Sequence, residues 1–328
     1  MPQKISEIKD ELVHSLIKNN LIRDKVQIRQ IELIEQGLIN YVFSIDVHNR
    51  SIIAKHAKDK ARARPLMNIN ADRLKAEYDA IMLFRKFVNK HNFPDPILFD
   101  NVNNILYLEK FSNDYLCMEK LLTNGKVSLK LARDLGRFAA MVHNKTSQCK
   151  ISFDNIKMIR QIKIPWIYEG ITKDKEIKCK INGLKKQLLE NKKCLVMGDF
   201  KPNNIFVSHD NFIVVDYEQA YYGDPVLDFA YLPASYIALS YLNPELQGKY
   251  IKATEEYWHS YLNRIVIENM QERALQHLGV ILLSRIDGIT KYQFLQDRNI
   301  STPLRKICKG LILGKIDNIS VLLGMIRK

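Results

Sequence analysis

The octapeptide MGDFKPNN, Met197 to Asn204, is the most informative part of this chain. Asp199 and Asn204 lie five residues apart in it, with Pro202 between them. Because proline fixes its own φ and keeps the preceding residue extended, we expect a loop here and not a helix. Such a loop can turn both polar side chains toward the same side.

Two apolar segments follow the octapeptide, Ile205–Val207 and Phe212–Val215, separated by the polar residues 208–211. This pattern predicts a β-hairpin whose second strand returns Asp216 to the neighbourhood of Asn204. A carboxylate and an amide oxygen that meet in this way suit a hard cation such as Mg²⁺. The sequence therefore predicts Asn204 and Asp216 as metal ligands.

Asp199 and Lys201 are the candidate catalytic residues. A carboxylate that does not bind the metal can accept the proton of an attacking hydroxyl, and a nearby ammonium can neutralise the charge of a phosphoryl group in transfer. This combination indicates phosphoryl transfer from ATP. The alternative is an Asx-rich turn that leads into a core hairpin, and the position of Asp216 favours the functional interpretation.

A lysine and a glutamate in the first third of the chain are predicted to pair. Lys55 ends an apolar strand, and Glu77 falls on the apolar stripe of a helix expected from about Ala71 to Val88. A carboxylate buried there is costly unless a cation accompanies it. We expect Lys55 to be that cation and to be held against nucleotide phosphates; the alternative is that Glu77 reaches solvent from the edge of the stripe.

The rest of the first third reads as a small sheet. The turn Glu35–Asn40 can lay its backbone N–H groups over phosphates, or it can be a plain β-turn. Residues 109–111 can read an adenine edge with backbone groups, or they can be a simple linker. Strands are predicted over 31–34, 41–47, 51–55, 97–99 and 105–108.

Helical periodicity prevails after residue 110, for example from Leu131 to Val142 and in the tail from about Glu245. The lysine-rich residues 171–193 are predicted to form an exposed loop or helix. We therefore expect an α+β protein in two parts. Residues 1–110 form a nucleotide-binding part with a small antiparallel sheet, and residues 111–328 form a larger, mainly helical part with the catalytic and acceptor-binding groups.

Three further polar residues are predicted to be structural. Asp224 is expected to cap the next helix, with Pro225 at its first position. Asp228 is expected to brace the catalytic loop and not to react, and His143 is expected to pack or cap at the end of an apolar helix.

Composition excludes several classes of protein. The net charge of +14 fits anionic ligands and raises a nucleic-acid binder as a rival, but the basic stretches lack interleaved aromatic residues, and we interpret them as a solvated surface. Five scattered cysteines, none in a C-x-x-C pair, favour a reducing cytosol. We predict neither a signal peptide nor a membrane span. The sequence has no hydrolase G-x-S-x-G motif and no P-loop.

Together these motifs resemble those of the aminoglycoside phosphotransferase and choline kinase superfamily, the small-molecule relatives of protein kinases. MGDFKPNN is similar to the H-G-D-x-x-x-x-N loop, with Met197 in place of the histidine, and thioether packing can substitute for it. Val214–Ala230 is similar to the metal-binding strand and G-D-P-x-x-D segment, and Leu131–Asn144 to the helix before the insertion. The first third is also similar, more loosely, to methylthioribose kinases.

The resemblance implies a two-lobed protein-kinase-like fold that uses ATP and Mg²⁺. It implies the following roles: Asp199 as catalytic base, Asn204 and Asp216 as Mg²⁺ ligands, Lys55 paired with Glu77 on the phosphates, Gly37 and Asn40 in an abbreviated phosphate loop, and Glu109, Lys110 and Phe111 as the adenine hinge. The order D-x-K-P supports a phosphate role for Lys201.

The acceptor is the least defined part of the prediction. Arg285 can hold an anionic group, Asp287 a hydroxyl or amine, and Glu218 can create a local acidic site for an aminoglycoside; ordinary surface salt bridges are the alternative for the residues of the helical tail. We expect an ATP-dependent phosphotransferase acting on a hydroxyl of a sugar, nucleoside-like or aminoglycoside-like molecule, as a cytoplasmic monomer or homodimer. The rival is a catalytically inactive kinase fold that binds nucleotide and regulates a partner.

Overall fold

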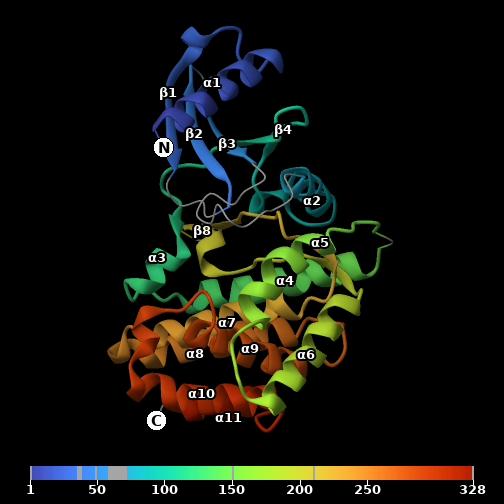
Figure 1. Cartoon of the computed structure of the whole chain (residues 1–328), viewed down its shortest axis with the longest axis vertical. Coiled ribbons are helices and arrows are strands. Elements are labelled where there is room, and N and C mark those ends of the chain that lie inside the picture. The colour runs from blue at the N-terminus through green and yellow to red at the C-terminus, as the bar shows by residue number, and fades with distance from the viewer. Residues whose placement is uncertain are drawn as a thin grey trace. The chain divides into compact units, whose positions relative to one another are not determined.

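The computed structural model describes residues 2–34, 39–48, 50–57, 72–149, 151–209 and 211–326. The chain divides into two compact units, Met1–Asn113 and Asp114–Lys328. Figure 1 labels their α-helices and some of their strands.

Unit 1 is built on an antiparallel five-stranded sheet in the order β1-β2-β3-β5-β4. The predicted strands are therefore confirmed, with ends that differ by a few residues. The elements of this unit are α1 (Pro2–Lys18), η1 (Lys25–Gln27), β1 (Ile28–Ile34), β2 (Tyr41–Val47), β3 (Arg50–His56), α2 (Arg73–Phe87), η2 (Lys90–Asn92), β4 (Pro96–Asp100) and β5 (Ile105–Glu109).

The two faces of this sheet serve different purposes. Alternate residues of a strand point to opposite faces, so Ile52 and Ala54 of β3 lie on one face and Lys55 on the other. The first face joins a buried apolar core with Leu12 and Leu16 of α1. The second face directs Lys55 toward Glu77 of α2, which it contacts. The amphipathic pattern of the sequence thus separates a core face from a face with charged groups.

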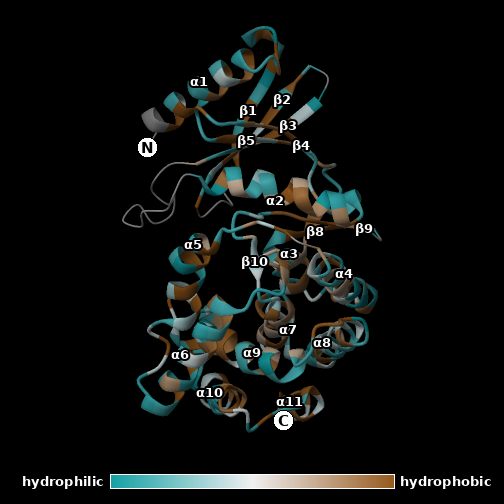
Figure 2. Cartoon of the chain, turned by 90° about the vertical axis from the view of Figure 1, so that its right-hand side faces the viewer, coloured by the Kyte–Doolittle hydropathy of each residue, from teal (hydrophilic) through white to brown (hydrophobic). Residues whose placement is uncertain are grey.

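Unit 2 is mainly helical around α7, which is buried along almost its whole length and packs against α8 and α9. Figure 2 shows α7 largely in the apolar colours. Its elements are β6 (Leu116–Cys117), α3 (Met118–Thr123), α4 (Leu129–Ser147), α5 (Ile156–Met158), the π-helix η3 (Ile159–Tyr168), α6 (Lys175–Glu190), β7 (Cys194–Val196), η4 (Pro202–Asn204), β8 (Ile205–Ser208), β9 (Asn211–Val214), β10 (Tyr221–Gly223), α7 (Val226–Ser240), η5 (Pro244–Leu246), α8 (Gln247–Leu262), α9 (Met270–Asp287), η6 (Gln293–Gln296), α10 (Arg298–Ile312) and α11 (Ile319–Ile326).

Two small sheets hold the octapeptide of unit 2. The strand β7 precedes it and pairs with β10, and β8 follows it and pairs with both β6 and β9. The predicted hairpin of β8 and β9 is confirmed. The octapeptide is a loop up to Lys201, as expected, but Pro202–Asn204 forms one short 3₁₀ turn, because proline is well suited to the first position of a helical turn.

The lysine-rich stretch is a helix, α6, which buries the apolar stripe Ile177, Ile181, Leu184 and Leu188 and leaves its lysines on the outer face. No helix within the described residues combines the length and the apolar character needed to cross a membrane.

Candidate active site

Asp228 fixes the loop that carries the candidate base. Its carboxylate accepts hydrogen bonds from the backbone N–H groups of Met197 at 2.6 Å and Gly198 at 2.9 Å. His143 lies behind it, with Nε2 3.2 Å from the same carboxylate and Nδ1 2.9 Å from Tyr261 Oη. The predictions that Asp228 braces the loop and that His143 packs are thus confirmed. The prediction that Asp224 caps α7 with Pro225 at its first position is wrong by one residue, because Pro225 is the N-cap and the helix begins at Val226; Asp224 lies before the cap and accepts the N–H of Val226 at 3.2 Å.

Asp199 is buried, and both of its carboxylate oxygens are engaged. Oδ2 lies 2.8 Å from Lys201 Nζ and accepts a hydrogen bond from Asn204 Nδ2 at 2.9 Å. Asn204 also donates to the backbone oxygen of Asp199 at 3.0 Å. The hydrogen bonds between Asn204 and Asp199 therefore join the two ends of this loop, and they bring Asp199, Lys201 and Asn204 together as predicted.

Lys163, which no sequence pattern predicted as a site residue, contacts the other carboxylate oxygen of Asp199. Its Nζ contacts Oδ1 of Asp199 and donates to Tyr231 Oη at 3.1 Å. Burial favours a raised pKa for the Asp199 carboxyl, but the positive charges of Lys163 and then Lys201 outweigh that effect and hold the pKa well below its ordinary value. Asp199 is therefore ionised at neutral pH.

The hairpin brings the backbone before Asp216 next to Asn204. The N–H of Val215 donates to the carbonyl oxygen of Asn204 at 2.9 Å, which sets Asp216 one residue beyond that pair. Because the amide nitrogen of Asn204 faces Asp199, its oxygen is left for another ligand. An amide oxygen and a carboxylate fit a hard cation that takes its remaining ligands from phosphates and water. Among the described residues there is no cluster of three or more His, Cys, Asp or Glu residues arranged to bind a metal.

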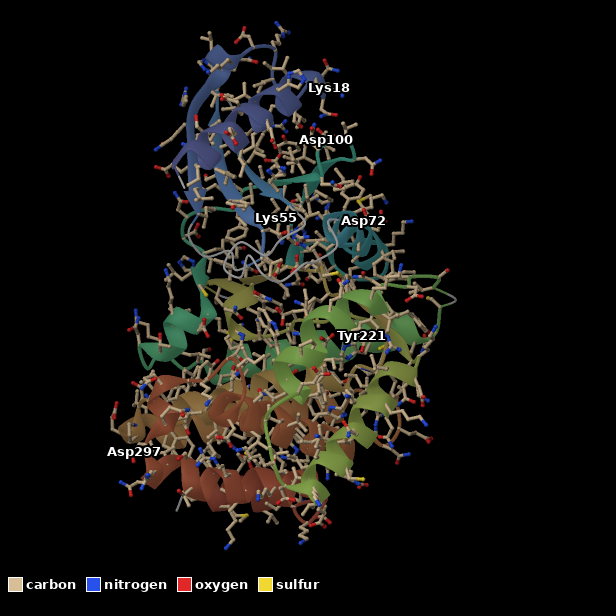
Figure 3. All side chains as sticks on the ribbon, viewed as in Figure 1. Lys18, Lys55, Asp72, Asp100, Tyr221 and Asp297 are labelled. Carbon is tan, nitrogen blue, oxygen red and sulfur yellow. The ribbon has the colours of Figure 1, made fainter. Side chains whose placement is uncertain are left out.

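Lys55 and Glu77 of unit 1 form the predicted pair. Lys55 Nζ lies 2.6 Å from Oε2 and 2.9 Å from Oε1 of Glu77, and their side chains are 9% and 0% exposed. Figure 3 labels Lys55 at its place on the sheet. The alternative, in which Glu77 reaches solvent, is therefore wrong.

The other predicted nucleotide-binding residues also lie in unit 1. Asn40 is buried and accepts a hydrogen bond from Arg73 Nε at 2.9 Å, whereas Gly37 lies outside the described residues. The N–H groups of Glu109 and Lys110 donate to the carbonyl oxygens of Asp95 and Ser51, at 2.8 and 3.0 Å.

These contacts limit how the hinge prediction can work. With two N–H groups already used by the sheet, an adenine edge would have to use the carbonyl groups or the backbone of Phe111, which directly follows. The hinge role of Glu109, Lys110 and Phe111 stays a prediction.

The predicted acceptor residues have different surroundings. Glu218 is buried, two residues beyond Asp216. Arg285 is half-buried and lies 5.3 Å from the ring of Tyr292. Both oxygens of Asp287 accept hydrogen bonds from Arg305, at 2.8 and 2.9 Å, so an acceptor bound by Asp287 would have to compete with this pair.

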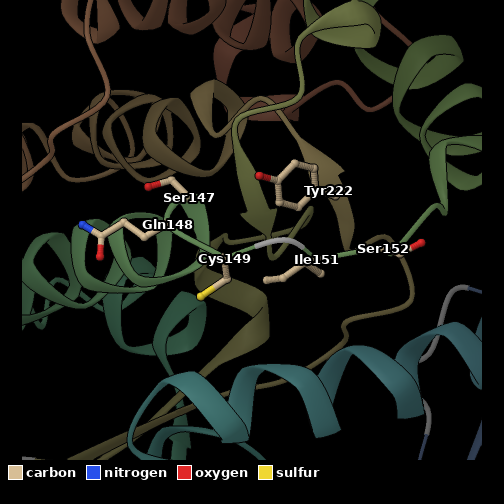
Figure 4. Close-up of a pocket in the computed structure, with 6 residues that line it drawn as sticks. All are labelled: Ser147, Gln148, Cys149, Ile151, Ser152 and Tyr222. Atoms are coloured by element: carbon tan, nitrogen blue, oxygen red, sulfur yellow. The ribbon is translucent and has the colours of Figure 1, made fainter.

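A separate hollow of about 500 Å³ lies near the end of α4, lined by Ser147, Gln148, Cys149, Ile151, Ser152 and Tyr222. Figure 4 shows these side chains around it. None of the predicted site residues lines it, so it does not belong to the candidate active site.

Comparison with known proteins defines the class of this one. The model of the phosphotransferase enzyme family matches residues 30–265, and the chain belongs to that family. Its fold is the two-lobed α+β fold of kinases, with a small antiparallel sheet in one lobe and a larger helical lobe. The resemblance identified from the sequence is thereby confirmed.

Particular relatives are distant. The methylthioribose kinases of Bacillus thuringiensis (strain Al Hakam) and Bacillus cereus (strain 03BB102) are 24% and 25% identical to the chain, and each alignment covers 86% of this chain and 85% of the relative. Among solved structures, a choline/ethanolamine kinase family protein from Mesorhizobium loti has a TM-score of 0.54 at 14% identity, covering 97% of this chain and 99% of that one. Choline kinase LicA from Streptococcus pneumoniae has a TM-score of 0.52 at 12% identity, covering 94% and 99%.

Proposed function

We propose that this protein is an ATP-dependent kinase that transfers the γ-phosphate to a hydroxyl of a small molecule, of the sugar, nucleoside-like or aminoglycoside-like kind. The observation that carries the proposal is the ionised, buried Asp199, held by Lys201 and Asn204 beside the strand end that bears Asp216. Membership of the phosphotransferase family supports the reaction type.

Each group of unit 2 has a chemical task in this proposal. Asp199 orients the acceptor hydroxyl and takes its proton, and Lys201 neutralises charge on the phosphoryl group in transfer. Asn204 and Asp216 would hold Mg²⁺, which when bound screens the charge of the phosphates. Most of the rate enhancement would come from positioning and charge neutralisation.

Unit 1 would hold the nucleotide. The ammonium of Lys55, fixed by Glu77, is the group we assign to the phosphates, together with the segment around Gly37 and Asn40. The described cysteines, all five of the chain, are free thiols, which supports our proposal of a reducing, cytoplasmic location.

The decisive experiment measures ADP release by the purified protein with Mg²⁺ and ATP against a panel of sugars, nucleosides, methylthioribose, choline, amino acids and aminoglycosides. For the best acceptor we predict that Asp199→Asn lowers kcat by about 10²- to 10⁴-fold and leaves MgATP binding unchanged. Asparagine is preferred to alanine because it keeps the size of the side chain and one acceptor oxygen for the lysines that contact the two oxygens of Asp199.

Two results would contradict the proposal. Full activity of Asp199→Asn would remove Asp199 as the base. MgATP binding without ADP release for every acceptor would instead favour the catalytically inactive, regulatory alternative.

A further inference from the structure

Lys163 is an unusual residue for its surroundings. It lies in the π-helix Ile159–Tyr168, which includes Pro165, and its buried neighbours in that segment are mostly apolar. Lys163 itself is 3% exposed and Tyr231 is 2% exposed. Its Nζ contacts Asp199 Oδ1, donates to Tyr231 Oη at 3.1 Å and lies 4.4 Å from the centroid of the Tyr231 ring. π-Helical turns are rare and frequent at functional sites.

Charge pairing alone does not account for this lysine. The Asp199 carboxylate already faces Lys201 at 2.8 Å and a hydrogen bond from Asn204 at 2.9 Å. A second buried ammonium adds a desolvation cost and leaves two positive charges beside one negative charge. If this contact were only structural, an apolar side chain could fill the position without the free-energy cost of burying an ammonium group.

Lys163 and Tyr231 each have a hydrogen-bond donor that they do not use within the described part of the chain. An ammonium group has three N–H donors, and a tyrosine hydroxyl has one donor and acceptor lone pairs. Lys163 uses two donors, on Asp199 and Tyr231, and Tyr231 uses a lone pair. Burial, and then the charge of Asp199, raise the pKa of Tyr231, so its hydroxyl keeps its proton. Among the described residues, no group accepts the third N–H of Lys163 or the O–H of Tyr231.

Two buried donors therefore stand side by side next to the base. We propose, on the basis of the kinase function above, that Lys163 and Tyr231 bind an oxygen of the acceptor that neighbours the hydroxyl oriented by Asp199. The acceptor is then a vicinal diol, a hydroxy ether or a hydroxy acid. An alcohol whose neighbouring substituent is an ammonium group has no lone pair to offer these donors, and its charge is repelled by Lys163.

The test compares matched acceptors. For the best acceptor of the panel, kcat/KM is measured with the parent compound and with its analogues in which the neighbouring oxygen is replaced by hydrogen or by an amino group. We expect wild type to prefer the parent by at least about 100-fold, because a site built to hydrogen-bond an oxygen leaves buried donors unpaired without it. Tyr231→Phe and Lys163→Met should each reduce that preference at least tenfold.

The ratio of two kcat/KM values from one preparation is independent of how much of the enzyme is folded, so a merely structural role would not change it. Tyr236→Phe is the matched control: Tyr236 lies on the same helix, is 1% exposed, and its Oη has no hydrogen-bond partner among the described residues. We expect this variant to keep the wild-type ratio. Lys163→Arg should restore part of the preference lost in Lys163→Met.

The outcomes separate this inference from the kinase function. Turnover of choline or another amino alcohol in preference to all polyoxygenated compounds would overturn the inference and leave the kinase function standing. An unchanged ratio in both Tyr231→Phe and Lys163→Met would do the same. If no acceptor of any class stimulates ADP release, the proposed function and the inference fall together.

Discussion

The charge balance of Asp199 illustrates how this site works at the scale of single residues. A carboxylate with two ammonium neighbours is a weak base, since its pKa lies well below the ordinary range. Orientation of the acceptor hydroxyl is therefore the main contribution of Asp199 in our proposal, and proton transfer is complete only late in the reaction. This agrees with the general character of phosphoryl transfer, in which positioning and neutralisation dominate.

The Lys55–Glu77 pair gives a stability prediction at the same scale. Lys55→Met leaves the fully buried Glu77 carboxylate without its ammonium partner and should lower the free energy of unfolding by roughly 3–5 kcal/mol. The double variant Lys55→Met/Glu77→Leu should recover most of that loss, because both charges are then removed. Urea unfolding followed by circular dichroism measures both values.

A control variant lies on the same helix. Lys75→Met removes an exposed pair with Asp79, in which the side chains are 48% and 41% exposed, and should change stability by less than about 1 kcal/mol. If the double variant were as unstable as Lys55→Met alone, loss of the Lys55–Glu77 ion pair would not be the cause of the lower stability.

At the scale of elements, the catalytic loop depends on a backbone conformation that only glycine adopts easily. Gly198 has a φ of +81°, and a Cβ at this position would lie 2.0 Å from the carbonyl oxygen of Gln219. We predict that Gly198→Ala destabilises the protein by more than about 2 kcal/mol and lowers kcat, because the loop can no longer present Asp199 beside Lys201.

The matched substitution is Gly183→Ala. Gly183 lies on the exposed face of α6 and an added Cβ meets nothing within 4 Å, so the change should stabilise the helix by about 0.5–1 kcal/mol. Thermal unfolding and steady-state kinetics of the two variants check the pair. Equal effects of both substitutions would show that the loop tolerates a Cβ.

Much of this arrangement could be predicted from sequence, for reasons that differ between elements. Apolar residues alternate along β2 and β3 and form a stripe on α2, because each element is buried on one face. These patterns were enough to predict the contact between Lys55 and Glu77. The loop from Asp199 to Asn204 could be predicted because Pro202 restricts the backbone locally.

Lys163 and Tyr231 could not be found in the same way. A π-helix follows neither the helical period of 3.6 nor the strand period of 2, and the alternation Ile162-Lys163-Ile164 with Pro165 next to it favours a strand or loop in a sequence reading. Tyr231 lies in a helix that is apolar on all sides, and a tyrosine in such a helix is normally interpreted as a residue of the hydrophobic core. The only signal was a lysine inside an apolar run.

At the scale of the whole molecule, the helical unit contains a titratable group that does not belong to the proposed chemistry. His277 of α9 is fully buried, and its Nδ1 lies 2.6 Å from Tyr168 Oη. Burial, and then the positive charge of Arg273, lower the pKa of His277 from 6.5 to about 3. The folded protein therefore keeps this ring neutral over a pH range in which the unfolded chain protonates it.

The sign of the effect follows from linkage. Below pH 6.5 the unfolded state binds one more proton than the folded state, so stability falls as the pH drops toward 3, by roughly 1 kcal/mol per pH unit. We predict that His277→Phe removes this part of the pH dependence while costing some stability at all pH values. Urea unfolding of both proteins between pH 4 and pH 8 checks it; parallel stability curves would exclude His277 as the titrating group.

The π-helical segment has one more practical consequence. It contains Trp166, three residues beyond Lys163, whereas the only other tryptophan of the chain, Trp258, is fully buried in α8. Indole emission responds to changes in local polarity, so the tryptophan emission wavelength of this protein should shift when a compound binds beside Lys163. An optical titration of the Asp199→Asn variant could then rank candidate molecules by occupancy, with no turnover required.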